Sequence, residues 1–343
     1  MLEKIEQELK IPAGFGIRPA KWSDLEASVS LFNLCDKAYS GSPSHTIEDL
    51  EIEWTSPNFD LEKSTRVIVA PNGDIVGYIE VWDLGSMPVS PSAWGRVHPD
   101  YENMGLGTVL LTWAEARARQ VLERIPEEIR VVMRASTVST NEGARQLFYD
   151  YGMTLVRHFW TMRIDFDGLP EQPVWPEGIR LTTFAERPNL SEVYHAFDEA
   201  FKDHWGHTPN APEEAIARWQ NWIERDPKYD PTLWFLALDG DEIAGVSLCR
   251  KVDPEIETHG HVNILGVRRP WRRQGLALAL LRHSFVELYK RGKQGVTLGV
   301  DASSLTGATR LYKKAGMYVA KQFDTFEKEL RPGRDIRTQS VTE

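Results

Sequence analysis

Hydrophobic and polar residues follow the same order in both halves of this chain. Segments 66–82 and 234–251 each consist of an alternating strand, a turn rich in Gly and Asp, and a second strand, a pattern that predicts a β-hairpin. Later in each half comes a further apolar segment, 129–136 or 295–303, which is typical of a buried strand. The repeated order predicts two copies of one α/β unit.

A glycine turn lies between a strand and a helix in each copy. Apolar residues precede Gly105 and Gly275, and a helical pattern follows each glycine. The two glycines are 275 − 105 = 170 residues apart, and Met153 and Met317, which end a later matching segment, are 317 − 153 = 164 residues apart. A nearly constant offset over several elements indicates a duplicated domain.

Mixed strands with helices on both faces predict two tandem three-layer α/β/α domains with mixed central sheets. We expect an N-terminal domain at 1–166, a proline-containing linker at 167–176 and a C-terminal domain at 177–330. Residues 331–343 are polar, and we expect them to form a frayed tail. The length of 343 residues agrees with two domains.

Composition narrows the classes of function. The net charge of −10 disfavours nucleic acid as a partner, and no apolar run approaches the ~20 residues of a membrane span. The charged N-terminus lacks the apolar core of a signal peptide, and the two cysteines, Cys35 and Cys249, lie in different halves. We therefore expect a cytoplasmic protein, monomeric or homodimeric, without a membrane or nucleic-acid partner.

The glycine turns are candidate phosphate sites. A glycine turn that opens a helix presents main-chain N–H groups, and the helix dipole adds attraction for an anion. The second turn reads RRQGLA, residues 272–277, and the first reads ENMGLG, residues 102–107. By itself, such a pattern is equally typical of a plain strand–helix connection that uses glycine for close packing.

A downstream segment makes the second turn more specific. RRQGLA fits the R/Q-x-x-G-x-G/A turn that binds the acyl-CoA pyrophosphate in the GNAT superfamily of N-acyltransferases, and L-Y-x-x-x-G follows at 311–316. The chain resembles a tandem member of that superfamily over about residues 15–166 and 177–330. The resemblance implies an N-acetyltransferase that uses acetyl-CoA as cosubstrate. It also implies direct transfer to a primary amine of a small acceptor in the C-terminal domain.

The resemblance further implies which residues hold the cosubstrate. Main-chain N–H groups of the turn would bind the diphosphate, and Arg272 would either add charge-assisted contacts or fix the loop. A splayed or bulged strand before the turn would leave an N–H free for the thioester carbonyl, and Ser304 would lie near the CoA arm. The expected cofactor-binding residues are Leu265, Gly266, Val267, Arg272, Arg273, Gln274, Gly275, Leu276, Ala277 and Ser304.

Transfer from a thioester to an amine needs a base for the amine and a proton for the departing thiolate. In the family, the Tyr of L-Y-x-x-x-G supplies that proton; here it is Tyr312, with a core aromatic role as the alternative. The matching position for a base, on the strand before the turn, holds His261, with Glu257 as the second candidate. In a regular strand both would share a face with His259. A packing or surface role is the alternative for His261.

The family builds its acceptor pocket in the helical region before the second hairpin. Candidates for this pocket, or for core packing, are Asp203, His204, Trp205, Trp219 and Trp222. The histidines in the segments 203–207 and 259–261 lack further ligands at useful spacing, so we expect no metal site.

The first half departs from the family pattern at two positions. Glu102 occupies the Arg or Gln position of the turn, where a carboxylate would repel a polyanion unless it turned away. Phe148 occupies the position of Tyr312 and has no hydroxyl. We expect a degenerate N-terminal domain beside a catalytic C-terminal one. The alternatives are a non-catalytic acyl-CoA-binding or interaction module and a dinucleotide-binding fold, for which residues 105–107 lack the third glycine.

Overall fold

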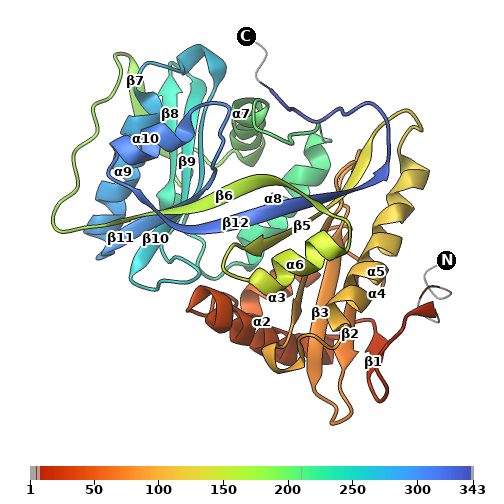
Figure 1. Ribbon diagram of the computed structural model, residues 1–343. Helices are drawn as coiled ribbons and strands as arrows, with labels where there is room; N and C mark the ends of the chain where they lie inside the picture. Colours follow the sequence, from red (N-terminus) through yellow and green to blue (C-terminus); the bar gives the residue numbers. More distant parts are fainter. Residues whose placement is uncertain (1–4, 6–7, 210, 341–343) are drawn as a thin grey trace. The chain divides into compact units, whose positions relative to one another are not determined.

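The protein is described by a computed structural model that covers residues 5, 8–209 and 211–340. The chain forms two compact units, whose elements are labelled in Figure 1. Unit 1 consists of Met1–Arg157 and Phe323–Ile336, and unit 2 of His158–Gln322 and Arg337–Glu343. In the described part of the chain, the helices are too short or too polar to cross a membrane.

Unit 1 is built on a mixed sheet with the strand order β1-β2-β3-β4-β5-β12. Neighbouring strands are antiparallel, except that β4 and β5 are parallel. The first predicted hairpin is formed by β2 and β3. The strands are β1 (Gly16–Arg18), β2 (Thr65–Val69), β3 (Ile75–Trp82), β4 (Ser92–Val97), β5 (Val131–Val138) and, from Phe323 onward, β12 (Tyr318–Arg331).

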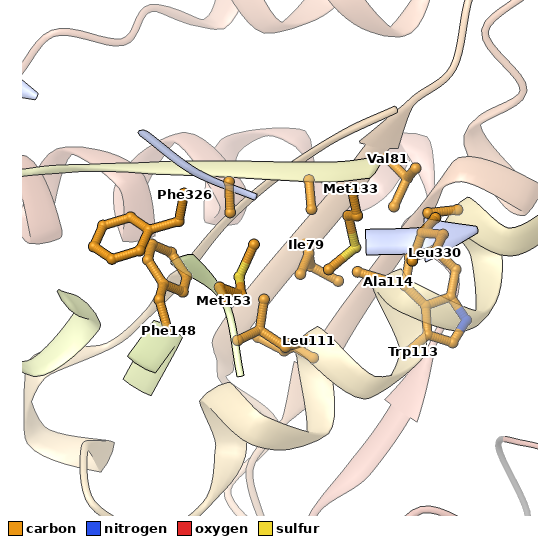
Figure 2. Close-up of a cluster of buried hydrophobic side chains, with 14 of the residues drawn as sticks. Ile79, Val81, Leu111, Trp113, Ala114, Met133, Phe148, Met153, Phe326 and Leu330 are labelled. Carbon is orange, nitrogen blue, oxygen red and sulfur yellow. The ribbon is translucent and has the colours of Figure 1, made fainter. Parts of the chain in front are cut away.

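Helices cover both faces of the unit 1 sheet. One face packs against α5 and α6, and the other against α2 and α3. Figure 2 shows the core under α5 and α6, where Phe148 lies beside Phe326 of β12. The helical elements are η1 (Trp22–Asp24), α2 (Leu25–Ser40), α3 (Ile47–Trp54), α4 (Leu61–Ser64), η2 (Pro99–Tyr101), α5 (Leu106–Ala118), η3 (Arg119–Arg124) and α6 (Glu142–Asp150).

Unit 2 repeats this architecture on a sheet with the order β6-β11-β10-β9-β8-β7. Again one pair, β10 and β11, is parallel, and the others are antiparallel. The second predicted hairpin is formed by β8 and β9. The strands are β7 (Ile179–Thr183), β8 (Trp234–Asp239), β9 (Glu242–Arg250), β10 (His259–Val267), β11 (Gly295–Asp301) and, from His158 onward, β6 (Thr154–Asp165).

Helices also cover both faces of the unit 2 sheet, so the predicted three-layer α/β/α fold class is confirmed. The face with Val262 and Leu298 packs against α9 and α10, and the face with Ile264 and Leu236 packs against α7 and α8. The helical elements are α7 (Leu190–Phe201), α8 (Pro212–Arg225), η4 (Pro231–Leu233), η5 (Arg269–Trp271), α9 (Leu276–Lys290) and α10 (Ala308–Lys314).

Each unit takes a strand from the other half of the chain. Residues 323–331 of β12 pair with β5 in unit 1, and residues 159–165 of β6 pair with β11 in unit 2. The sequence does not reveal this exchange, because each strand still follows its own repeat in chain order. The boundaries 1–166 and 177–330 describe the two sequence repeats. That each of these segments folds as a domain stays a prediction.

The described part of the C-terminal tail is held by main-chain hydrogen bonds rather than frayed. Arg130 N donates to Arg334 O at 3.0 Å, and Thr338 N donates to His207 O at 2.9 Å. The amino-acid composition of the tail could not predict these hydrogen bonds, because they join main-chain groups and do not depend on the side chains.

Candidate active site

Strands β10 and β11 of unit 2 separate partway along their length. Their parallel pairing begins at His259 and Gly295 and ends at Val262 and Leu298, although β10 continues to Val267. Residues 263–267 therefore form a splayed edge of β10 that no longer pairs with β11. This edge leads directly into η5 and the glycine turn.

A β-bulge marks the start of the splayed edge. In the ladder with β9, Val262 pairs with Cys249 and Ile264 pairs with Leu248, so Asn263 is the extra residue. Beyond the bulge, the side chains of β10 alternate between the two faces of the sheet in the opposite order. Val262 and Leu265 both pack in the core under α9, whereas Ile264 packs under α7. The bulge agrees with the splayed or bulged strand that the resemblance implies, and it places His261 and Val267 on opposite sides of the sheet.

Two main-chain N–H groups point out from the splayed edge. Arg268 N donates to Ala244 O of β9 at 3.0 Å, so alternate residues, including Gly266, direct their N–H groups toward β9. Leu265 and Val267 direct theirs toward the unpaired side. Of the three expected donors, the structure thus excludes Gly266. A Cβ at Gly266 would lie 2.9 Å from Phe201 of α7, which explains this glycine by packing.

The turn before α9 has a backbone suited to an anion. Gly275 is the N-cap of α9 with φ +89°, and Arg273 also has a positive φ, of 64°. No side chain of the described residues caps α9, so the first N–H groups of the helix remain available. A Cβ at Gly275 would meet no atom within 4 Å, so conformation rather than crowding requires the glycine.

The side chains of the turn residues point in several directions. Leu276 is buried in the core under α9, and Ala277 packs at its margin. Gln274 donates from Nε2 to Pro270 O at 3.1 Å, which closes the turn locally. Main-chain groups, rather than these side chains, are therefore the candidate ligands for a diphosphate.

Arg272 fixes the loop. Its Nε donates to Val267 O at 3.0 Å, its Nη2 donates to Ala200 O at 3.0 Å, and its Nη1 donates to Asp203 Oδ2 at 2.5 Å. Hydrogen bonds from Arg269 and Arg272 hold the pKa of Asp203 well below its usual range, despite the opposing effect of burial. Of the two roles weighed for Arg272, the structure supports the loop-fixing one. Asp203 anchors the turn, which corrects its expected place in an acceptor pocket.

Tyr312 lies on α10 in the core beneath α9 and α10. The ring is buried, and it belongs to the same core cluster as Val262 and Val267 of β10. Its hydroxyl forms no hydrogen bond with any of the described residues, and burial raises its pKa to about 12. A phenol with this pKa stays protonated at neutral pH and can donate a proton.

His261 lies one residue before the last β10–β11 pair, on the face covered by α7 and α8. Its Nδ1 is 2.6 Å from Thr297 Oγ1 and 3.2 Å from Asp253 Oδ2. The hydroxyl of Thr297 in turn donates to the same carboxylate. The sequence analysis missed both partners, although a polar Thr within the apolar strand 295–301 was a signal.

The remaining candidates lie elsewhere. Glu257 is exposed in the loop before β10, at the end of that strand away from the turn. His259 is buried, and its Nε2 lies 3.0 Å from Asp165 Oδ1 of β6. Ser304 Oγ accepts from Ala308 N at 3.3 Å and so supports the start of α10.

The aromatic residues near α8 are part of the core. Trp222 stacks on Trp234 at 6.1 Å with an interplanar angle of 8°, and Trp219 lies 5.9 Å from the same ring. Trp205 donates from Nε1 to Gln339 Oε1 at 3.0 Å. Burial lowers the pKa of His204 to about 4. These contacts favour packing over an aromatic wall for Trp219 and Trp222.

Unit 1 contains the same turn with different chemistry. Gly105 caps α5 with φ +81°, and Asn103 has φ 60°, matching Gly275 and Arg273. The carboxylate of Glu102, the residue before Asn103, accepts a hydrogen bond from Tyr39 of α2. Phe148 packs against Phe326 with centroids 5.1 Å apart.

The residues that the structure describes contain no group of three or more His, Cys, Asp and Glu side chains able to hold a metal ion. The two cysteines are buried, and burial raises the pKa of Cys249 to about 11.

The glycine turn at the N-terminus of α9, beside the splayed edge of β10, presents main-chain N–H groups that suit a phosphate group. The chain belongs to the acetyltransferase (GNAT) family, whose model matches residues 29–153 and 190–317, together more than half of the chain. It is an acyl-CoA-dependent N-acetyltransferase with two domains of this type. The predicted tandem organisation, similar in layout to mycothiol synthase, is confirmed.

Two relatives share most of the chain. A protein of Streptomyces scabiei named mycothiol acetyltransferase is 28% identical over 270 residues, which cover 77% of this chain and 78% of the relative. A protein of the same name from Thermobispora bispora is 29% identical over 303 residues, covering 85% and 92%.

Solved structures share the architecture. The crystal structure of a GCN5-related N-acetyltransferase from Sphaerobacter thermophilus is 35% identical, with a TM-score of 0.77, and the alignment covers 95% of this chain and 99% of that one. A tandem GNAT protein from the clavulanic acid biosynthesis pathway has a TM-score of 0.64 at 14% identity, covering 93% and 100%, which is a likeness of fold alone.

Proposed function

We propose that unit 2 transfers an acetyl group from acetyl-CoA to a primary amine of a small molecule by direct attack. The observation that carries this proposal is Tyr312, a buried phenol whose hydroxyl has no hydrogen-bond partner among the described residues, in the same core cluster as Val262 and Val267 of β10. Unit 1 has Phe148 at the matching position, which supports a catalytic role for unit 2 alone. Identities of 28–29% to the named relatives leave the particular acceptor open.

The residues of unit 2 fit acetyl-CoA, the acyl donor of the GNAT family. The turn at Gly275 offers uncapped N–H groups, and a Cβ at Gly275 would meet no atom within 4 Å, which suits a closely approaching diphosphate. The N–H groups of Leu265 and Val267 are placed to donate to a carbonyl oxygen along the splayed edge. Arg272 and Asp203 hold the turn and the end of β10 together.

The two proposed proton transfers involve residues on opposite faces of the unit 2 sheet. His261 accepts the proton of the amine as the nitrogen bonds to the acyl carbon, and Tyr312 donates a proton to the sulfur as the C–S bond breaks. Solvent exchange then restores both groups. Since His261 faces α7 and α8 while Tyr312 packs under α9 and α10, we propose that the amine approaches from the α7 and α8 face. Glu257 is the second candidate base.

The test is a thiol-release assay with acetyl-CoA and a panel of primary amines, run beside calorimetry of acetyl-CoA binding. We expect release that depends on an amine and on Tyr312. Binding of acetyl-CoA without amine-dependent release from any member of a broad panel would support the alternative, a non-catalytic acyl-CoA-binding module. Absence of acetyl-CoA binding would contradict both.

A further inference from the structure

Three polar side chains meet on the α7 and α8 face of the unit 2 sheet. His261 of β10 and Thr297 of β11 are register partners in the parallel ladder, and Asp253 comes from the loop that follows β9. Asp253 is held by main-chain donors, since Glu255 N and Ile256 N lie 2.9 and 2.8 Å from its Oδ1. Its second oxygen, Oδ2, is left for His261 and Thr297.

The number of available protons determines which group donates in each hydrogen bond of this cluster. Burial opposes ionisation of Asp253, but hydrogen bonds from His261 and Thr297 lower its pKa to about 2, so near neutral pH its carboxylate only accepts. The single hydroxyl proton of Thr297 is donated to that carboxylate. The Nδ1 of His261 therefore faces two acceptors, at 2.6 and 3.2 Å, and must itself carry a proton.

We infer that Asp253 and Thr297 are positioning residues, which keep a proton on Nδ1 of His261 and leave its Nε2 as the acceptor for the amine proton. The catalytic part of this inference rests on the proposed function, whereas the tautomer does not. No described residue bonds to Nε2, and the side chain of His261 is 22% exposed. A fixed tautomer matters because only an unprotonated nitrogen can accept a proton.

His259 shows the opposite arrangement on the same strand. Its Nε2 lies 3.0 Å from the Asp165 carboxylate, and its Nδ1 lies 3.1 Å from Thr258 Oγ1. Burial opposes ionisation of Asp165, but hydrogen bonds from Arg163, Tyr318 and His259 lower its pKa to about 2, so this carboxylate also accepts, here from Nε2. The two histidines are therefore expected to be opposite tautomers, and His259 is an internal control.

Charged groups near this cluster form ion pairs with one another. Arg250 of β9, the register neighbour of His261, lies 3.0 Å from Asp226, which follows α8. In β6, Arg163 forms an ion pair with Asp165. In the loop before β10, Glu255 forms an ion pair with Lys321. Asp253 is the charged group in direct contact with His261.

The tautomer can be measured without any activity. Nitrogen-15 spectra of histidine-labelled full-length protein, assigned with His261→Ala and His259→Ala, report which ring nitrogen carries the proton. We expect the proton on Nδ1 for His261 and on Nε2 for His259 in the neutral form. In Asp253→Asn, whose amide can donate, we expect the His261 proton to redistribute toward Nε2 while His259 is unchanged. A His261 protonated on Nε2 in the wild type would overturn the inference.

Kinetic measurements can distinguish a positioning role of Asp253 from a purely structural role. We expect Asp253→Asn to lower kcat by about tenfold or more, with unchanged affinity for acetyl-CoA, and to add nothing further in a His261→Ala background. Asp230→Asn, which removes a carboxylate bonded to Thr232 and Arg291, should leave kcat and the pH profile as they are. Equal losses with and without His261 would show a structural role and overturn the inference. An inactive wild type with the expected tautomer would instead reject the proposed function.

Discussion

Arg272 Nη1 donates to Asp203 Oδ2 at 2.5 Å, and this ion pair joins the glycine turn of unit 2 to the end of α7. Asp203 is buried, and Arg272 is also bonded to two main-chain carbonyl groups. The arginine that marks the sequence motif therefore acts on the shape of the turn. Its place in the motif is explained without direct contact to a phosphate.

Arg272→Ala should weaken acetyl-CoA binding by about tenfold, or ~1.4 kcal/mol, because the turn loses its anchor. Arg269→Ala is the matched control: Arg269 also contacts Asp203, but its side chain is 53% exposed. Arg269 bonds to Asp203 but not to the main-chain carbonyls that Arg272 holds, so its loss should change the affinity for acetyl-CoA less than the loss of Arg272 does. Calorimetry on both variants checks this. Equal losses would show that net positive charge, not the anchor, supports binding.

Gly275→Val should abolish detectable acetyl-CoA binding. The glycine has φ +89°, which a branched side chain adopts poorly, and the strain distorts the N–H groups of the turn. Gly292→Val is the control, because Gly292 has φ +82° and equally open surroundings but follows the end of α9. The assignment would be supported if both variants lost similar thermal stability but only Gly275→Val lost acetyl-CoA binding. Wild-type affinity in Gly275→Val would defeat it.

Asp253→Asn should also change stability in a pH-dependent way. The pKa of Asp253 is lowered from 3.8 to about 2 in the folded state, so its contribution is present above about pH 4 and is lost as the pH falls toward 2. The shift corresponds to about 2 kcal/mol. Urea unfolding at pH 7 and at pH 3 should show the variant less stable at pH 7, with a smaller difference at pH 3. A difference that grew toward acidic pH would contradict the assignment.

Phe148→Tyr should not create a second active centre. Phe148 is buried against Phe326, and a hydroxyl placed there without a partner costs about 1–3 kcal/mol. Tyr149→Phe, at an exposed neighbouring position, should change stability by less than about 0.5 kcal/mol. The measurement is turnover of the double variant Phe148→Tyr, Tyr312→Phe. Recovery of activity in it would show that unit 1 is also catalytic.

Much of the fold follows from local sequence signals. The hairpins contain Asp and Gly between alternating strands, and Gly105 and Gly275 cap helices at positive φ, as strand–turn–helix patterns require. The exchange of β6 and β12 has no such signal, because pairing partners distant in the chain are selected by tertiary packing. Alternation within a strand does not name its neighbour.

The site was predicted in part. A bulge such as that at Asn263 leaves no residue-type signature, so the faces of His261 and Val267 could not be assigned from parity. Arg272 and Asp203 are 69 residues apart in sequence, and only the folded chain shows their pairing. Asp253 lies in a loop with no helical or strand period to place it beside His261. The predicted roles of Tyr312 and His261 stay predictions until they are measured.

The most direct test of the account is the turnover of Tyr312→Phe with acetyl-CoA and an amine that the wild type accepts. We expect kcat to fall by at least about tenfold while the dissociation constant for acetyl-CoA stays within about twofold, because the proton matters mainly in the transition state. Tyr289→Phe, on α9, should match the wild type in both quantities. Wild-type turnover in Tyr312→Phe, or a loss confined to acetyl-CoA affinity, would contradict the account.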